Sequence, residues 1–235
     1  MTVFRLPEQN IFPSPCLAED NGLLAVGGDL SESRLLNAYK EGIFPWYSHG
    51  DPILWWSPNP RLIIKPENFI LSRSLRQTLK KNTFRITMDT VFREVIENCS
   101  EVHKKKAGDT WITREMINAY IDLHDSGYAH SIEAWKGNEL AGGLYGVSLG
   151  SAFFGESMFT KTSNASKAAF AALVFQVSSW KFSFIDCQVT TKHLLSLGAS
   201  EIPRDEFLNM LADSLEAPAK KHKWSFDENT LINNL

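Results

Sequence analysis

The sequence predicts an α/β (α+β) fold with a small N-terminal domain, residues 1–60, and a larger domain, residues 61–235. The first sixty residues hold seven of the ten prolines and three of the seven tryptophans, which is typical of a short, irregular unit. Beyond them, amphipathic helix patterns alternate with strand patterns, three of which form a meander. A chain of 235 residues is long enough for one such core with a small companion.

The N-terminal domain is predicted to contain one helix. Ser31 is placed to cap a helix over residues 32–41, and Gly42 is placed to end it in a left-handed turn. Short strands are predicted at residues 53–56 and 62–65, on either side of the domain boundary.

The larger domain is predicted to alternate helices and strands. Its helices are expected at residues 71–81, from the Asp89 cap to Cys99, from the Thr113 cap to Gly127, from the Asn164 cap to Trp180, and at 204–215. Its strands are expected at residues 84–88, 130–136, 139–147, 151–159 and 182–188, with a turn at Gly137 and Asn138. The poorly apolar segment Ser100–Asp109 is predicted to be a loop.

The composition excludes some classes of protein. The 24 Lys and Arg against 27 Asp and Glu give a formal net charge of −3, so any contact with RNA has to be local. The cysteines Cys16, Cys99 and Cys187 lack a paired metal-ligand spacing and suit free thiols in a reducing compartment. We find no signal-peptide pattern and no apolar run of about eighteen residues. We therefore expect a cytoplasmic protein with no membrane contact and no metal.

Two predicted strands carry side chains suited to chemistry. Strand alternation places Asp186 and Gln188 on one face and Ile185 and Cys187 on the other. Without further information, such a pair is more often made of ordinary polar residues facing solvent. Glu156 lies on an otherwise apolar strand, so its carboxylate has to be paired, exposed or functional.

Trp46 follows Pro45 in a segment that we expect to be an exposed turn. A tryptophan there could stack on a nucleobase, a contact that is worth about 1–3 kcal/mol per base. The alternative is that Trp46, Trp55 and Trp56 join the small domain to the large one.

Several motifs occur in one order along most of the chain. They are Asn-Gly-Leu-Leu-Ala-Val-Gly-Gly-Asp-Leu at 21–30, Gly-Ile-Phe-Pro-Trp at 42–46, Leu-Trp-Trp-Ser-Pro at 54–58, Thr-Trp-Ile-Thr-Arg at 110–114, Gly-Glu-Ser-Met-Phe at 155–159, Asn-Ala-Ser-Lys at 164–167 and Ile-Asp-Cys-Gln at 185–188. The sequence closely resembles the bacterial leucyl/phenylalanyl-tRNA–protein transferases from about residue 11 to about residue 208.

The resemblance implies a reaction and a fold. The family transfers Leu or Phe, and less readily Met, from aminoacyl-tRNA to proteins that begin with Arg or Lys, which marks them for N-degron proteolysis. In that family a small N-terminal domain precedes a domain that resembles the acetyltransferases. The resemblance implies no cofactor, and we expect a monomer.

The resemblance also suggests roles for individual residues. Asp186 and Gln188 would hold and polarise the attacking amine, and Glu156 would hold the cationic acceptor end or brace Gln188. The pocket for the transferred side chain maps onto Leu144, Phe153, Met158, Phe170, Leu173 and Ile185, and the site of the terminal adenosine maps onto Trp46, Trp111 and Tyr120. Phe153 and Met158 differ in strand parity, so both can face one cavity only if the strand contains a bulge.

Two basic segments are candidates for contact with the body of the tRNA. Arg73, Arg76 and Lys80 share one face of the predicted helix 71–81. Lys104, Lys105 and Lys106 lie in the segment that is predicted to be a loop. Each group on its own is more often a solvated surface, but a tRNA substrate favours phosphate contacts.

Three other functions stay open. An acyl-CoA-dependent N-acetyltransferase would share much of the fold, although Gly142, Gly143 and Gly146 do not form a clear pyrophosphate loop. A non-catalytic RNA-binding module would need only the tryptophans and the basic residues. A thiol hydrolase built from Cys187, His193 and Asp186 is disfavoured because alternation points Cys187 away from Asp186.

Overall fold

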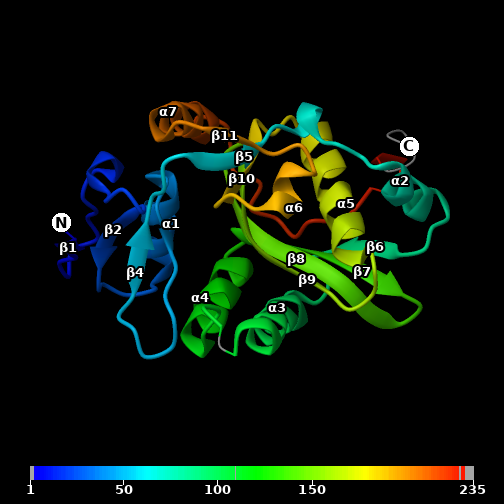
Figure 1. Ribbon diagram of the computed structural model, residues 1–235, viewed down its shortest axis with the longest axis horizontal. Helices are drawn as coiled ribbons and strands as arrows, with labels where there is room; N and C mark the ends of the chain where they lie inside the picture. The colour runs from blue at the N-terminus through cyan, green and yellow to red at the C-terminus, as the bar shows by residue number, and fades with distance from the viewer. Residues whose placement is uncertain (1–2, 109, 228, 231–235) are drawn as a thin grey trace.

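A computed structural model of the chain describes residues 3–108, 110–227 and 229–230. The N-terminal part contains a four-stranded sheet, in the order β1 (Phe4–Arg5), β2 (Leu23–Val26), β4 (Leu54–Trp56) and β3 (Phe44–Pro45). It also contains the short 3-10 helix η1 (Pro15–Leu17) and helix α1 (Glu32–Lys40). Figure 1 shows this part at one end of an elongated molecule.

The rest of the chain is built around a seven-stranded mixed sheet. Its strands, in spatial order, are β11 (Ser200–Ile202), β5 (Arg61–Ile64), β10 (Phe184–Gln188), β9 (Ala152–Thr160), β8 (Glu139–Leu149), β7 (Ala129–Lys136) and β6 (Arg85–Met88). Strands β9 and β10 run parallel, and the other neighbouring pairs of this sheet are antiparallel. The predicted α/β (α+β) class and its central meander are confirmed.

Helices cover both faces of the large sheet (Figure 1). On one face, α5 (Ala165–Ser179) packs on β7, β8 and β9, and α2 (Arg73–Lys80) packs on α5. On the other face, α3 (Phe92–Ala107) and α4 (Arg114–Asp125) cover the meander. The remaining elements are η2 (Pro66–Asn68), α6 (Lys192–Leu195) and α7 (Arg204–Leu215). None of the helices described in the structure has the length and apolar character needed to cross a bilayer.

Local capping explains where several helices begin. The side chains of Ser31, Ser72 and Thr113 each accept a hydrogen bond from the backbone N–H three residues further on. Gly42 has a φ of 71° directly after α1, where a residue without Cβ is favoured. These ends agree with the pattern read from the sequence.

Three local predictions are wrong. Asp89 does not cap the helix that follows it: α3 begins at Phe92 after Val91, no described side chain makes a capping bond there, and the Asp89 carboxylate accepts instead from the backbone N–H groups of Ser131 and Trp224.

The segment predicted to be a loop continues α3 as far as Ala107, because it keeps a buried face: Ser100 is buried and its hydroxyl donates to the Ile112 carbonyl. Asp109, at the end of that predicted loop, lies outside the described residues. Asn164 precedes α5 as predicted, but it has a φ of 69° and its side chain makes no capping bond.

The division near residue 60 stays a prediction. The four-stranded sheet lies within residues 4–56, and the seven-stranded sheet starts at Arg61. The two parts share one apolar core, to which Trp55, Phe184 and Phe207 all contribute.

Candidate active site

A cavity opens where the two parallel strands of the large sheet separate. The pairing of β9 with β10 extends to Phe154 and Asp186. Two positions further along each strand, Glu156 and Gln188 border a cavity of about 420 Å³. The place where the pairing of β9 with β10 ends therefore brings a carboxylate and a carboxamide to the edge of one cavity.

A β-bulge at Glu156 shapes this cavity. In the pairing of β8 with β9, Tyr145 is opposite Ser157 and Gly146 is opposite Gly155, which leaves Glu156 as the extra residue. The bulge reverses strand parity beyond it. Phe153 and Met158 consequently both line the cavity, which meets the condition set from the sequence.

The cavity wall is largely apolar. The structure brings together all six residues predicted for the side-chain pocket, and they line the cavity: Leu144, Phe153, Met158, Phe170, Leu173 and Ile185. Trp46 and Trp111, two of the three residues predicted near the adenosine, also line it, as do Phe44 and Pro45 of β3.

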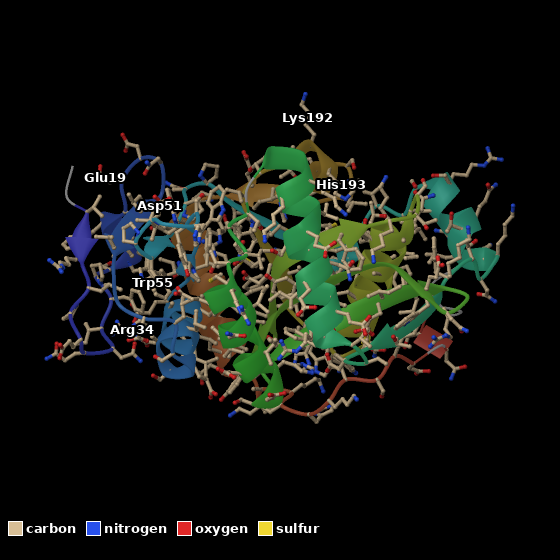
Figure 2. All side chains as sticks on the ribbon, turned by 90° about the horizontal axis from the view of Figure 1, so that it is seen from below. Glu19, Arg34, Asp51, Trp55, Lys192 and His193 are labelled. Carbon is tan, nitrogen blue, oxygen red and sulfur yellow. The ribbon has the colours of Figure 1, made fainter. Side chains whose placement is uncertain are left out.

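The tryptophans of the N-terminal part divide into two kinds. Trp55 is fully buried and its Nε1 donates to the Gly27 carbonyl, so it belongs to the core (Figure 2). Trp46 is 41% exposed and borders the cavity, and Trp56 braces it by donating from Nε1 to the Trp46 carbonyl. Of these three, Trp46 is thus the one available for stacking on a ligand at this cavity.

Three polar side chains donate hydrogen bonds to Glu156, which is buried. The Tyr39 hydroxyl donates to Oε1 at 2.7 Å, the Tyr120 hydroxyl donates to Oε2 at 3.1 Å, and Gln188 Nε2 donates to Oε1 at 2.8 Å. The oxygens of the two tyrosine hydroxyls are also in contact with each other, so these two phenols and the carboxyl form one compact polar cluster. Tyr120 therefore reaches Glu156 from within the protein and does not line the cavity, contrary to its predicted place beside the adenosine.

Burial changes the acidity of this carboxyl. It raises the pKa of Glu156 from 4.5 to about 7, while the hydrogen bonds from Tyr39, Tyr120 and Gln188 lower it and the charge of Asp186 raises it further. A carboxyl with such a pKa can exchange a proton near neutral pH.

Asp186 lies behind the cavity. Its side chain is fully buried and accepts from Arg61 Nε at 2.9 Å and from Arg61 Nη2 at 2.7 Å. The register of β10 against β5 slips between Asp186 and Gln188, and Gln188 has a φ of 62°. Strand alternation predicts that both side chains open on the same space, but only Gln188 lines the cavity.

Cys187 and His193 also line the cavity. Burial raises the pKa of Cys187, which keeps its sulfur as the less nucleophilic thiol. Burial, helped by the charge of Lys167, lowers the pKa of His193. These properties argue against a thiol hydrolase.

Sequence reasoning missed other residues at this site. His103 lines the cavity and its Nε2 lies 3.0 Å from the Ser157 hydroxyl, but it comes from the segment predicted to be a loop. No sequence motif points to a role at this site for Tyr39 of α1 or Arg61 of β5. Their partners lie 117 and 125 residues away along the chain, so no local pattern connects them.

The predicted basic groups lie outside the cavity. On α2, Arg73 and Lys80 are exposed and Arg76 is partly buried. Lys104 and Lys105 are exposed on α3, which corrects their predicted place in a loop, and Lys105 lies 3.7 Å from Glu101. The side chain of Lys106 lies outside the described residues. A role for these groups in tRNA binding stays a prediction.

Two further tests concern cofactors. Gly142, Gly143 and Gly146 lie inside β8 and do not form a loop that leads into a helix, so they make no pyrophosphate site of that kind. Within the described ranges, we find no group of three or more His, Cys, Asp or Glu residues that could hold a metal ion.

Comparison with known proteins identifies the family. The family model for the leucyl/phenylalanyl-tRNA protein transferases matches residues 63–212, and the model for the N-terminal domain of the same family matches residues 28–59. A leucyl/phenylalanyl-tRNA–protein transferase of Desulfatibacillum aliphaticivorans is 58% identical over 97% of each chain. The chain belongs to this family. Membership in the leucyl/phenylalanyl-tRNA–protein transferase family confirms the resemblance read from the motifs.

Other relatives agree along almost the whole chain. A leucyl/phenylalanyl-tRNA–protein transferase of Desulforapulum autotrophicum is 53% identical, covering 96% of this chain and 99% of the relative. One from Legionella pneumophila is 56% identical, covering 92% and 96%. Among solved structures, a DUF2156 domain from Agrobacterium fabrum, named for lysylphosphatidylglycerol synthetase, shares 9% identity and a TM-score of 0.39, a likeness too weak to carry an argument.

Proposed function

We propose that this chain, an aminoacyltransferase by its family, moves leucine or phenylalanine from aminoacyl-tRNA to proteins whose N-terminal residue is arginine or lysine. The observation that carries the proposal is the apolar cavity beside Gln188 and Glu156. It offers room for one large apolar side chain next to groups that can act on an amine and an ester. Methionine would be used less readily.

The cavity suits a range of apolar side chains. A volume of about 420 Å³ and a wall of aromatic, Leu, Ile and Met side chains are typical of a site that binds by exclusion of water. An apolar wall distinguishes two substrates that differ by one methylene by only about 1–3 kcal/mol of binding free energy. Use of both leucine and phenylalanine is therefore physically reasonable.

The chemistry needs no covalent intermediate on the enzyme. The amine nitrogen bonds to the ester carbonyl carbon, the ester C–O bond breaks, and a proton from the amine ends on the ribose oxygen of the tRNA. An α-amino group with an ordinary pKa of about 7.7–8.0 is partly neutral near pH 7, so alignment can supply much of the rate.

Gln188 and Glu156 are proposed to act on the attacking amine. The Gln188 carboxamide lines the cavity and offers a carbonyl oxygen to an N–H. Glu156, with a pKa of about 7, would accept the amine proton and return it to the leaving oxygen. Asp186 would contribute through Gln188, because its Oδ1 accepts the Gln188 backbone N–H at 2.9 Å.

A preference for Arg or Lys at the acceptor N-terminus also draws support from Glu156. Among the described residues that line the cavity, it is the one carboxylate, and a carboxylate is a natural partner for a cationic side chain. For the tRNA, Trp46 and Trp111 are proposed to hold the terminal adenosine by stacking. The exposed cations of α2 and α3 are proposed to contact phosphates.

The test supplies leucyl-tRNA and a peptide that begins with arginine, and mass spectrometry follows the gain of one leucine at the N-terminus. Three controls use the N-acetylated peptide, a peptide that begins with aspartate, and free leucine with uncharged tRNA. Transfer to the arginine peptide alone is expected. Acetylation of the peptide from labelled acetyl-CoA, without leucine transfer, would contradict the proposal and favour an N-acetyltransferase.

A further inference from the structure

A buried arginine lies directly behind the candidate site. Arg61, the first residue of β5, is 0% exposed, and its guanidinium lies over the rings of Phe207, at 4.4 Å from the centroid, and of Phe44, at 4.9 Å. Its Nη1 donates to the Gly42 carbonyl at 3.1 Å. Figure 1 shows β5 entering the large sheet from the N-terminal part, beside β10.

The carboxylate that Arg61 holds is tied in turn to Gln188. Arg61 donates two hydrogen bonds to Asp186, a fork that fixes the plane of the carboxylate. Asp186 Oδ1 also accepts the Gln188 N–H, at a residue whose backbone has the left-handed φ of 62°. A side chain other than glycine adopts that conformation only where its surroundings enforce it.

The chain of contacts continues to the cavity. Gln188 Nε2 donates to Glu156 Oε1, and Tyr39 and Tyr120 hold the same carboxyl from the other side. Arg61 touches neither the cavity nor Glu156. Its hydrogen bonds reach Gln188 through Asp186, and its guanidinium also packs on Phe44, which lines the cavity.

We propose that Arg61 is a positioning residue: it fixes the Asp186 carboxylate, which holds the Gln188 backbone in its left-handed conformation and so aims the carboxamide at the cavity. The inference rests on the proposed function, since it assumes that Gln188 acts on the amine. In this arrangement Asp186 stays paired with Arg61 throughout the reaction and takes no proton from the substrate.

The first experiment separates turnover from binding. Arg61→Met removes the guanidinium and keeps an unbranched side chain. Misplacement of Gln188 is expected to lower kcat by about 100-fold while KM for leucyl-tRNA changes by less than about threefold, because the apolar wall remains. Arg61→Lys keeps the charge but not the fork, and is expected to lose less activity. A folded Arg61→Met variant with the kcat of the parent would overturn the inference.

A paired variant tests the route through Asp186. In Arg61→Met/Asp186→Asn both buried charges are gone, but the carboxamide oxygen introduced by the second change can still accept the Gln188 N–H. The kcat of the paired variant is expected to exceed that of Arg61→Met, so the two changes are not additive. If Arg61→Met fails to fold, Arg61→Lys takes its place: its kcat should fall while KM for leucyl-tRNA stays the same, and a folded Arg61→Lys variant with the kcat of the parent would contradict the inference.

The dependence of kcat on pH distinguishes a positioning role of Arg61 from a purely structural one. A purely structural role would not shift this dependence in opposite directions in the two variants below. The groups facing Glu156 are Tyr39, Tyr120, Gln188 and Tyr145 of β8, together with the charge of Asp186, which raises the Glu156 pKa. Without Arg61, that charge is unopposed, and the rise of kcat with pH should move to higher pH. In Asp186→Asn the rise should move to lower pH. Shifts in the same direction would contradict the inference.

Two controls keep the outcomes distinct. Arg34→Met removes another buried arginine, 1% exposed and paired with Asp29, which Figure 2 shows in the N-terminal part away from His193 of α6; its kcat should be unchanged. Gln188→Ala tests the role of Gln188 on which the inference rests, and the parent tests the proposed function. A parent without leucine transfer would remove the proposed function. Full turnover by Gln188→Ala would remove the role of Gln188, whereas an inactive Gln188→Ala together with a fully active Arg61→Met would remove only the role of Arg61.

Discussion

Gln188 has a buried carboxylate on each side, and the two carboxylates are held differently. On the β5 side, Asp186 is paired with the Arg61 guanidinium at 2.7 Å. On the β9 side, Glu156 has only uncharged donors, two phenols and the carboxamide, and burial raises its pKa to about 7. A cation pairs with the first, while the second, held by neutral donors, can gain or lose a proton near neutral pH. One network thus combines an anchor with a proton acceptor.

The largest loss of stability and turnover is expected when Asp186, the carboxylate paired with Arg61, is replaced. Asp186→Ala leaves the Arg61 cation buried without a carboxylate, which should lower the free energy of unfolding by about 3–5 kcal/mol. Turnover should fall as well, because the Gln188 N–H loses its acceptor. Urea unfolding and single-turnover transfer measure the two losses. A variant as stable as the parent would show that the ion pair is no anchor.

Replacement of Glu156 should change how the free energy of unfolding depends on pH. The folded-state pKa of Glu156, about 7, lies above 4.5, so its contribution to stability is full below pH 4.5 and is lost as pH rises through 7. In Glu156→Gln this loss should be absent. Between about pH 4 and pH 8 the free energy of unfolding of the parent should therefore fall by roughly 3 kcal/mol more than that of the variant. Burial also raises the pKa of Glu133 and Glu41, but they are common to both proteins.

Removal of one tyrosine hydroxyl, from Tyr39 or Tyr120, should have a smaller effect, through the pKa of Glu156. Tyr39→Phe removes a hydrogen bond that lowers the Glu156 pKa, so the rise of turnover with pH should move to higher pH. The lost bond should cost about 1.5–3 kcal/mol of stability above pH 7, where Glu156 is charged. Tyr120→Phe is the matched variant and should shift the profile in the same direction. A shift to lower pH would mean that the phenols do not stabilise the carboxylate.

The smallest effect is expected at Cys187, which lies between the two sides in sequence. Cys187→Ala removes a buried thiol whose pKa burial raises, so turnover should change by less than about twofold. The same transfer assay compares it with Asp186→Ala, whose loss should be far larger. Equal losses in the two variants would undo the assignment of the site.

Local chemistry made much of the fold predictable. Residues close in sequence determine the caps at Ser31 and Thr113 and the turn at Gly137. The helices that begin at these caps and the strands on either side of the turn lie where expected. The apolar pocket also followed from the family motifs. The end of α3 was misjudged because its last two turns are largely polar, and burial of one face outweighed that composition.

The polar half of the site could not be read in the same way. The register slip after Asp186 and the bulge at Glu156 interrupt strand alternation, so faces counted from the sequence fail at the residues that matter. The contacts of Arg61 with Asp186 and of Tyr39 with Glu156 join distant parts of the chain. Only tertiary packing shows which acid receives a cation and which does not.

The titration of Glu156 can be measured directly by following the ¹³C chemical shifts of glutamate side-chain carboxyls with pH in labelled protein. The signal of Glu156 is the one that disappears in Glu156→Gln. We predict that it titrates with a midpoint near 7. A midpoint at or below the ordinary value of 4.5 would contradict the account, because Glu156 would then be ionised at neutral pH and could not act as the proton acceptor described.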